Sequence, residues 1–152
     1  MEIERKYLVR QLPADLDDYP HVEIEQSYLC TSPTVRIRRI DNVYVLTVKE
    51  KAPSTSSAIH NREEEFSLDG NTYRALLAKC DGNVVRKTRY RVPLSNGLTA
   101  ELDVFHGAHQ GLILVEVEFP DTATADNYTP PAWFGEDVSR DPRYRNSFLS
   151  RG

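Results

Sequence analysis

Hydrophobic and polar residues alternate along most of this chain in short runs, and clusters of turn-forming residues separate many of these runs. Alternation with a period of two buries one face of an extended segment and leaves the other face polar, so it predicts β-strands. Eight such runs occur, at residues 2–9, 22–30, 34–40, 43–51, 62–68, 84–92, 98–105 and 112–119. Eight short strands tend to close into a barrel or to split into two layers.

The sequence predicts three helices and one irregular loop between or after these strands. Asp69 can cap a helix with an apolar stripe at helical spacing, formed by Tyr73, Leu76, Leu77 and Cys80. Shorter helices are predicted at residues 122–128 and 142–149. Residues 52–61 are small, polar and interrupted by proline, so they are predicted to form a mobile surface loop.

Composition restricts the classes of protein that fit. The chain has 152 residues, the size of one ordinary domain, and we expect a single domain over residues 1–152. Its net charge of -4 argues against a nucleic-acid partner, and no apolar run is long enough to suggest a membrane partner. The two cysteines, Cys30 and Cys80, predict neither a disulfide framework nor a zinc site, so a cytoplasmic location is expected.

The polar faces of the predicted strands are charged, and most of them carry one sign of charge. The acidic positions are Glu2, Glu4, Glu63, Glu65, Glu101, Asp103, Glu116 and Glu118. The basic positions are Lys6, Arg36, Arg38, Lys49, Lys51, Lys87, Arg89 and Arg91. A solvated surface explains such a face on any single strand, but segregation by sign over seven strands differs from an ordinary mixed surface.

These charged faces favour an α+β fold in which an eight-stranded antiparallel β-barrel forms a tunnel with a charged interior, and helices pack outside. So many charges need water and bound ions, because an unpaired ion in a dry interior is strongly destabilising. The basic faces suit a polyanion, and the acidic faces suit a hard divalent cation, which prefers oxygen ligands. A metal that bridges to phosphate oxygens is the usual arrangement for phosphoryl transfer.

An ordered series of short motifs carries a family resemblance. The motifs are E-I-E-R-K at 2–6, V-R-I-R-R at 35–39, L-T-V-K at 46–49, R-E-E-E-F at 62–66, K-T-R-Y at 87–90, E-L-D-V-F at 101–105, L-V-E-V-E-F at 114–119, P-A-W-F-G-E-D-V at 131–138 and R-Y-R-N at 143–146. The first resembles the E-x-E-x-K signature of the CYTH, or triphosphate tunnel metalloenzyme, superfamily. The whole series is most similar to the compact bacterial inorganic tripolyphosphatases.

This resemblance implies hydrolysis of inorganic triphosphate to pyrophosphate and phosphate by a metal-activated water inside the tunnel, with Mg²⁺ or Mn²⁺ as cofactor. It implies metal ligands at Glu2, Glu4, Glu116, Glu118 and Asp103. It implies a phosphate-binding set of Lys6, Arg36, Arg38, Lys49, Lys87 and Arg89. Catalytic positions would be Glu63, Glu65, Glu116 and Lys87.

Other functions stay open at this point. A class IV adenylyl cyclase, a thiamine triphosphatase or a nucleoside triphosphatase would use the same scaffold, and a polyphosphate- or nucleotide-binding module would use it without catalysis. The expected ligand in the leading hypothesis is a small-molecule triphosphate, and a homodimer is an open alternative to a monomer.

A few residues have uncertain or plainer interpretations. Residues 62–65 are all charged, so a slip of one residue would turn Glu64 into the tunnel in place of Glu63 and Glu65. Lys51 and Arg91 lie at strand ends and are predicted to be solvated. Trp133 is predicted to pack outside the barrel, and surface positions are predicted for His21, His60, His106 and His109.

Overall fold

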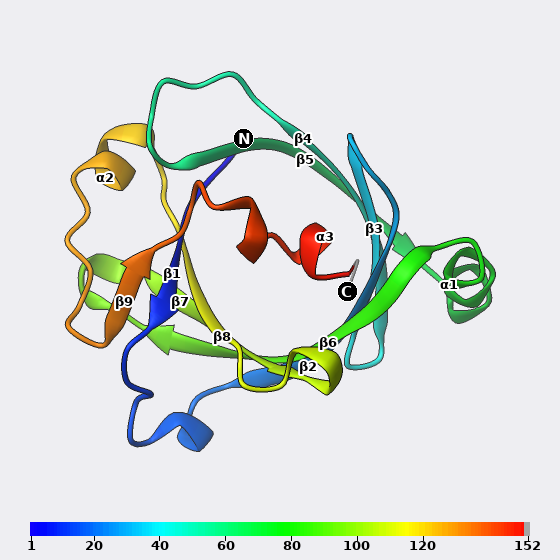
Figure 1. Cartoon of the computed structure of the whole chain (residues 1–152), viewed down its shortest axis with the longest axis horizontal. Helices are drawn as coiled ribbons and strands as arrows, with labels where there is room; N and C mark the ends of the chain where they lie inside the picture. The colour runs from blue at the N-terminus through cyan, green and yellow to red at the C-terminus, as the bar shows by residue number, and fades with distance from the viewer. Residues whose placement is uncertain (151–152) are drawn as a thin grey trace.

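The computed structural model describes residues 1–150, and its strands form one antiparallel sheet that closes into a barrel (Figure 1). The strands are β1 (Glu2–Val9), β2 (His21–Thr31), β3 (Thr34–Ile40), β4 (Val43–Lys51), β5 (Ile59–Leu68), β6 (Asp81–Pro93), β7 (Thr99–His106), β8 (Ile113–Glu118) and β9 (Phe134–Asp137). Their order is β5-β4-β3-β2-β6-β7-β8-β1-β9, and a β5–β1 pairing closes the ring. The predicted eight-stranded antiparallel barrel is therefore confirmed.

The closure between β1 and β5 is short. Glu2 lies opposite Asn61 and Glu4 opposite Ile59, whereas β1 pairs with β8 over the longer run from Glu4 to Leu8. The short strand β9 adds to the remaining edge of β1 near Tyr7 and Val9. This ninth strand was not predicted, because its four residues follow a proline-rich segment and show no long alternation.

The larger apolar cluster lies outside the barrel. Buried side chains such as Tyr7, Leu102, Val115 and Val117 point away from the interior and pack under β9, the helix that follows β8 and the segment after β1. Trp133 packs on this layer through a contact with Phe134, as predicted. Since the residues of this cluster face outward, the charged residues that alternate with them along the strands face inward.

The helices are short. They are α1 (Gly70–Leu77), α2 (Thr122–Asp126) and α3 (Asn146–Leu149), with 3-10 turns η1 (Leu16–Asp18), η2 (Ser95–Gly97), η3 (Gly107–His109) and η4 (Pro142–Tyr144). Asp69 caps α1 as predicted, since its side chain accepts a hydrogen bond from the Thr72 amide at 2.7 Å. The helix predicted at 142–149 is instead split at Arg145 into η4 and α3, because Arg145 has an extended backbone.

The C-terminal segment turns back into one end of the barrel (Figure 1). Leu149 on α3 packs with Val85, Phe105 and Leu114, which are inward-facing residues of β6, β7 and β8. Gly82 has φ +76, and a Cβ there would lie 2.5 Å from the Ser150 carbonyl oxygen, so a side chain at this position would obstruct the approach. The apolar contact of α3 closes this end of the interior.

The predicted mobile loop at 52–61 is wrong in part. Strand β5 already begins at Ile59, and Ala52 and Ala58 are buried. The Arg140 guanidinium donates hydrogen bonds to the carbonyl oxygens of residues 56–58, which ties the segment to the rest of the fold. His60 is also buried, contrary to the predicted surface position.

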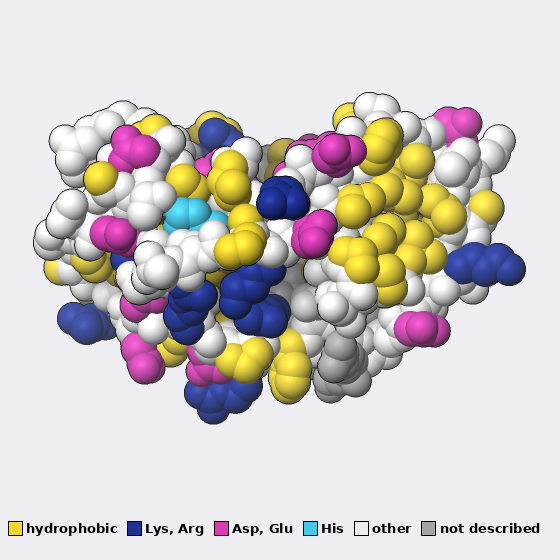
Figure 2. Space-filling view, turned by 90° about the horizontal axis from the view of Figure 1, so that it is seen from above, with side chains coloured by type: hydrophobic (Ala, Val, Ile, Leu, Met, Phe, Trp, Pro, Cys, Tyr) yellow, Lys and Arg dark blue, Asp and Glu magenta, His cyan; other side chains and the backbone are white. Residues whose placement is uncertain are grey.

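The outer surface is mixed. Among the large apolar side chains, Phe66 and Val43 are more than half exposed. Figure 2 shows that apolar side chains gather on one half of the face it presents, while several basic side chains lie near its middle. Within residues 1–150, no helix is long and apolar enough to cross a membrane.

Candidate functional site

A polar cavity of about 830 Å³ occupies the barrel interior. Every barrel strand except β6 and β7 contributes at least two residues to its wall, and β6 and β7 contribute at least one each. The C-terminal segment forms part of one side. The acidic lining residues are Glu2, Glu4, Glu50, Glu63, Glu65, Glu101, Glu116 and Glu118. The basic lining residues are Lys6, Arg36, Arg38, Lys49, Lys51, Arg89, Arg140 and Arg145.

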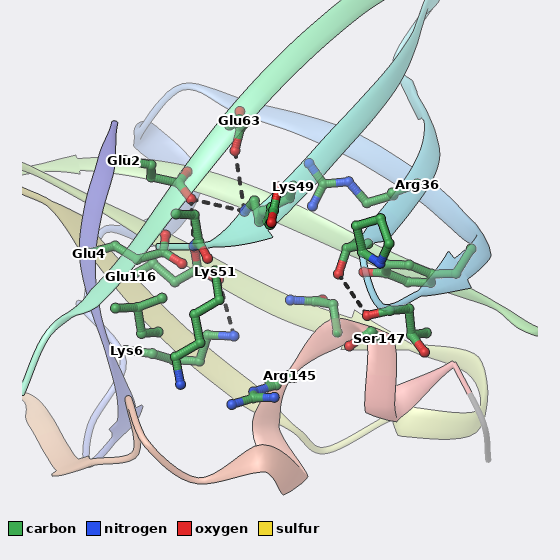
Figure 3. A pocket seen from close by; sticks show the side chains of 18 of the residues that line it. Glu2, Glu4, Lys6, Arg36, Lys49, Lys51, Glu63, Glu116, Arg145 and Ser147 are labelled. Atoms are coloured by element: carbon green, nitrogen blue, oxygen red, sulfur yellow. Dashed lines mark hydrogen bonds and ion pairs between the residues drawn. The ribbon is translucent and has the colours of Figure 1, made fainter. Parts of the chain in front are cut away.

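The acidic side of the cavity is built by the pairing of β1 with β8. Glu4 lies directly opposite Glu118, and Lys6 lies opposite Glu116. Residues directly opposite each other on antiparallel strands share one face, so these carboxylates converge without any loop. Figure 3 shows Glu2, Glu4 and Glu116 gathered on the same side of the cavity.

The register of β5 resolves the ambiguity in the run of three glutamates. Glu63 pairs with Lys49 and Glu65 with Thr47, so both follow the inward face of β4. Both line the cavity, whereas Glu64 pairs with the outward Val48 and is exposed. The Lys49 ammonium joins two strands of this wall, at 3.0 Å from Glu2 and 3.3 Å from Glu63 (Figure 3).

The carboxylates of this wall differ in their affinity for protons. Burial, followed by repulsion from Glu116 and Glu2, raises the pKa of Glu4 well above its ordinary value. Burial opposes ionisation of Glu116 too, but Lys6 and Arg89 hold its pKa well below the ordinary value. Burial and the charge of Glu2 also raise the pKa of Glu118. Ionised Glu4 and Glu118 therefore lack sufficient positive charge nearby.

The donor set fits a hard divalent cation. Glu2, Glu4, Glu116 and Glu118 offer only carboxylate oxygens, which Mg²⁺ and Mn²⁺ prefer over softer ligands. Among residues 1–150, no three acidic, histidine or cysteine side chains already converge as a closed metal site. Lysines lie between the carboxylates instead, with Lys6 3.6 Å from Glu116 and Lys49 close to Glu2.

The opposite wall carries two arginines from β3. Arg36 and Arg38 are 8% and 9% exposed, and neither forms an ion pair with a carboxylate within residues 1–150. Arg38 donates to the Gln26 amide oxygen at 2.8 Å, and the buried Nε of Arg36 has no hydrogen-bond partner. Burial and the nearby Arg36 and Arg89 lower the pKa of Arg38, so a bound anion would relieve this repulsion.

Two predicted site residues lie beneath the cavity wall. Lys87 and Asp103 are 0% and 1% exposed, do not line the cavity, and contact each other at 2.8 Å. Asp103 also accepts two hydrogen bonds from the Arg89 guanidinium, at 2.8 and 2.9 Å. With both oxygens occupied by cations, Asp103 is placed to orient Arg89 rather than to bind a metal.

Lys87 has a second tie, to the C-terminal segment. Its ammonium donates to the Asn146 side-chain oxygen at 3.1 Å. Burial lowers the pKa of Lys87 to about 7, although Asp103 opposes the shift. In this arrangement Lys87 can support the cavity wall, but it does not reach the cavity itself.

The cavity also contains residues that sequence reasoning did not assign to the site. Lys51 is exposed at its strand end, in keeping with its predicted solvation, and it also lines the cavity together with Tyr28 and Arg145. Arg145 belongs to the R-Y-R-N motif, which was the one available signal. Arg91 is exposed and lies outside this cavity, in keeping with its predicted solvation.

Comparison with known proteins identifies the class. The CYTH domain matches residues 1–143, and the chain belongs to this family. It is 39% identical to the inorganic triphosphatase of Nitrosomonas europaea, over 98% of this chain and 96% of the relative. It is 34% identical to the inorganic triphosphatase of Acetivibrio thermocellus, over 97% and 92% of the two chains.

Solved structures agree with this fold. The crystal structure of the inorganic triphosphatase NE1496 matches with a TM-score of 0.72 and 36% identity, covering 100% of this chain and 95% of that chain. The protein HpAC1 from Hippeastrum matches with a TM-score of 0.63 and 19% identity, over 82% of each chain, which is a likeness of fold.

Proposed function

We propose that this protein hydrolyses inorganic triphosphate to pyrophosphate and phosphate with the help of a divalent metal ion. The observation that carries the proposal is the pair Arg36 and Arg38, which are buried, face the cavity and have no carboxylate partner within residues 1–150. Figure 3 shows Glu2, Glu4 and Glu116 across the cavity from Arg36. The names of the relatives that cover nearly the whole chain support the same reaction.

The basic residues bind and orient the substrate. Arg36 and Arg38 hold phosphate oxygens, because the guanidinium fork matches two oxygens of one phosphate group. Lys49 and Lys6 act as point charges at the acidic side, where each now contacts a glutamate. Arg89 is fixed by its double hydrogen bond to Asp103, so it presents its remaining edge to the cavity.

The acidic residues hold the metal. Glu2, Glu4, Glu116 and Glu118 would supply the oxygen ligands for Mg²⁺ or Mn²⁺. When bound, such an ion neutralises charge on the phosphate oxygens and makes a nearby water more acidic. The same ion offsets the repulsion that raises the pKa of Glu4 and Glu118.

The chemical step needs only water and positioned charges. A water oxygen forms a bond to the terminal phosphorus, the anhydride bond on its far side breaks, and pyrophosphate leaves. Glu63 or Glu65 lies in the cavity and can accept the proton of the attacking water. Catalysis then consists of positioning and charge stabilisation, as in other phosphoryl transfers.

Phosphate release at about pH 8.5 tests this proposal. Tripolyphosphate, pyrophosphate, ATP and thiamine triphosphate are each offered with Mg²⁺, Mn²⁺ or EDTA. We expect metal-dependent turnover of tripolyphosphate well above that of the other three. Glu4→Gln should abolish it, whereas Glu64→Gln, which changes an outward side chain on β5, should not.

Other outcomes assign other functions. Full activity of Glu4→Gln would contradict the proposal. Cyclic AMP formed from ATP would indicate an adenylyl cyclase, and preference for ATP or thiamine triphosphate would indicate a different triphosphatase. Tight binding of tripolyphosphate in EDTA, with no turnover under any condition, would indicate a binding module.

A further inference from the structure

Gln26 is a fully buried polar residue to which the proposed function gives no role. It lies on β2, its side chain is 0% exposed, and Arg38 lies directly opposite it on β3. Residues directly opposite each other on antiparallel strands share one face of the sheet, so the Gln26 side chain points into the barrel beside Arg38. Burying an amide costs free energy unless its hydrogen bonds are satisfied, so its contacts indicate what it does.

Both ends of the Gln26 amide are hydrogen-bonded. Its Oε1 accepts a hydrogen bond from Arg38 Nε at 2.8 Å, and its Nε2 donates to the Tyr28 hydroxyl oxygen at 3.3 Å. Arg38 fixes this orientation of the amide, because a guanidinium has only donors and therefore requires the amide oxygen. The Tyr28 hydroxyl is an acceptor toward Gln26, so its own proton points away from Gln26, and Tyr28 lines the cavity.

Arg89 is held in a different way from Arg38. The Asp103 carboxylate accepts hydrogen bonds from Arg89 Nε at 2.8 Å and from Arg89 Nη2 at 2.9 Å, so the contact that orients Arg89 also neutralises it. At Arg38 the acceptor is an uncharged amide oxygen, and it contacts only Nε. The two terminal nitrogens and the positive charge of Arg38 therefore stay available to an anion in the cavity.

We propose that Gln26 is a positioning residue, which orients Arg38 toward the substrate without neutralising its charge. The inference rests on the proposed function, because it assumes that Arg38 binds a phosphate group. A carboxylate at this position would hold Arg38 Nε but would also repel the polyanion. An apolar side chain would leave Arg38 Nε buried without an acceptor. An uncharged acceptor meets both requirements, orientation and retained charge.

Two substitutions of similar size separate these requirements. Gln26→Glu keeps an acceptor for Arg38 Nε and adds a negative charge, whereas Gln26→Met removes the acceptor and adds no charge. We would measure KM and kcat for tripolyphosphate, and the melting temperature of the metal-free protein, in both variants. Gln11→Glu is the matched charge control, because Gln11 is exposed on the segment after β1.

Affinity and stability should change in opposite orders in the two variants. Gln26→Glu should raise KM about ten-fold or more with a smaller change in kcat, because the added charge repels the substrate. Its melting temperature should not fall, since Arg38 gains a charged partner. Gln26→Met should raise KM about three-fold and lower the melting temperature, because Arg38 Nε loses its acceptor. Gln11→Glu should match the wild type in all three quantities.

A second background separates the effect on Arg38 from an effect on Tyr28. The carboxylate introduced by Gln26→Glu would also accept the Tyr28 proton, so the substitution is repeated in Tyr28→Phe. KM should rise by a similar factor there, and a rise that disappears in this background would overturn the inference. A purely structural role predicts the largest KM in the least stable variant, and that result would overturn it too.

Failure of the proposed function is visible separately, because the wild type would then bind tripolyphosphate without turnover. Calorimetric titration of tripolyphosphate into the metal-free proteins in EDTA measures the same order as dissociation constants. A dissociation constant that Gln26→Glu leaves unchanged would reject the positioning role without reference to turnover. Wild-type protein that neither binds nor hydrolyses tripolyphosphate would contradict both the proposed function and the role of Gln26.

Discussion

Individual residues of the interior differ in whether their charge is already neutralised. Lys49 forms ion pairs with both Glu2 and Glu63, and Arg89 forms an ion pair with Asp103. Arg36 has only a 3.4 Å contact from Nη2 to the Thr47 hydroxyl, and its Nε is buried without a partner. A buried cation without a negatively charged partner destabilises the fold. We therefore infer that a bound ligand supplies the negative charge that Arg36 lacks.

Replacing Arg36 should weaken the binding of tripolyphosphate without lowering the stability of the metal-free protein. Arg36→Gln removes a two-pronged phosphate contact, so we expect KM for tripolyphosphate to rise about ten-fold or more. Because the substitution also removes a buried charge without a carboxylate partner, the melting temperature of the metal-free protein should not fall. Arg39→Gln is the matched control, since Arg39 is exposed on the same strand. A lower melting temperature with unchanged KM would assign Arg36 a purely structural role.

The β5 register makes a second residue-level prediction. Glu63 contacts Lys49 inside the cavity, whereas the adjacent Glu64 is exposed on the outer face. Glu63→Gln should reduce kcat/KM about ten-fold or more, because it weakens the charge that positions Lys49 and water. Glu64→Gln should remain within about two-fold of the wild type. The reverse ranking would place β5 one residue out of register.

At the scale of elements, the C-terminal segment is bound to the wall it covers. Lys6 donates to the Tyr144 carbonyl oxygen and Lys87 to Asn146, so two inward lysines are held by this segment. Leu149 adds an apolar contact with Phe105 and Leu114. Placement of the two interior lysines therefore depends on η4, which contains Tyr144, and on α3, a helix of only four residues.

Shortening Leu149 tests this dependence. Leu149→Ala leaves a cavity beside Phe105, and we expect a loss of about 2 kcal/mol in the free energy of the docked state. The Asn83 amide, which donates to the Ser150 carbonyl oxygen, should then exchange its hydrogen faster. Phe148→Ala on the same helix removes a side chain that is 48% exposed and should have little effect. Equal exchange in both variants would show that Leu149 does not hold the segment.

The elements that the sequence predicts are those that show their own periodicity. The eight barrel strands alternate over long runs, and Asp69 is a local cap, so both could be found without knowing the fold. Strand β9 and the buried part of the segment at 52–58 depend on distant partners instead. Arg5 bonds the Ser57 hydroxyl and Arg140 bonds backbone of the same segment, and sequence patterns contain no sign of contacts across such separations.

The sequence predicts which side chains face the barrel interior, but not which of them reach the cavity. Alternation correctly sends Glu2, Glu4, Arg36 and Arg38 to the interior, because a face is a local property of a strand. Whether an inward residue reaches the cavity depends on neighbouring strands and on what covers them. Lys87 is covered from α3 by Asn146 and therefore lies below the wall, a result of tertiary packing.

At the scale of the whole molecule, the charges inside the barrel make the stability of the fold depend on pH. Glu116 has a lowered pKa because Lys6 and Arg89 oppose the effect of its burial, so its ion pairs stabilise the fold above the ordinary glutamate range. Glu4 has a raised pKa, so its ionisation opposes folding in the same range. The metal-free fold therefore retains one carboxylate at the expense of stability.

Neutralising Glu4 should make the metal-free protein more stable. The folded state raises the pKa of Glu4 through burial and through Glu116 and Glu2, so ionised Glu4 destabilises it at about pH 8. Glu4→Gln removes that charge, and urea unfolding in EDTA should give a higher midpoint than the wild type. The gain should shrink as pH falls towards the ordinary glutamate pKa of about 4.3, since Glu4 is then protonated in both states.

The exposed Glu64 supplies the control for this pH dependence, because Glu64→Gln should change the midpoint little at either pH. A Glu4→Gln variant that is less stable at about pH 8, or whose gain does not vary with pH, would contradict the repulsion inferred for the carboxylate wall. With Mg²⁺ or Mn²⁺ added, the order should reverse, because a bound cation stabilises only a wall that retains its charge. The Glu4 carboxylate would then destabilise the metal-free barrel and stabilise the barrel that holds the metal ion.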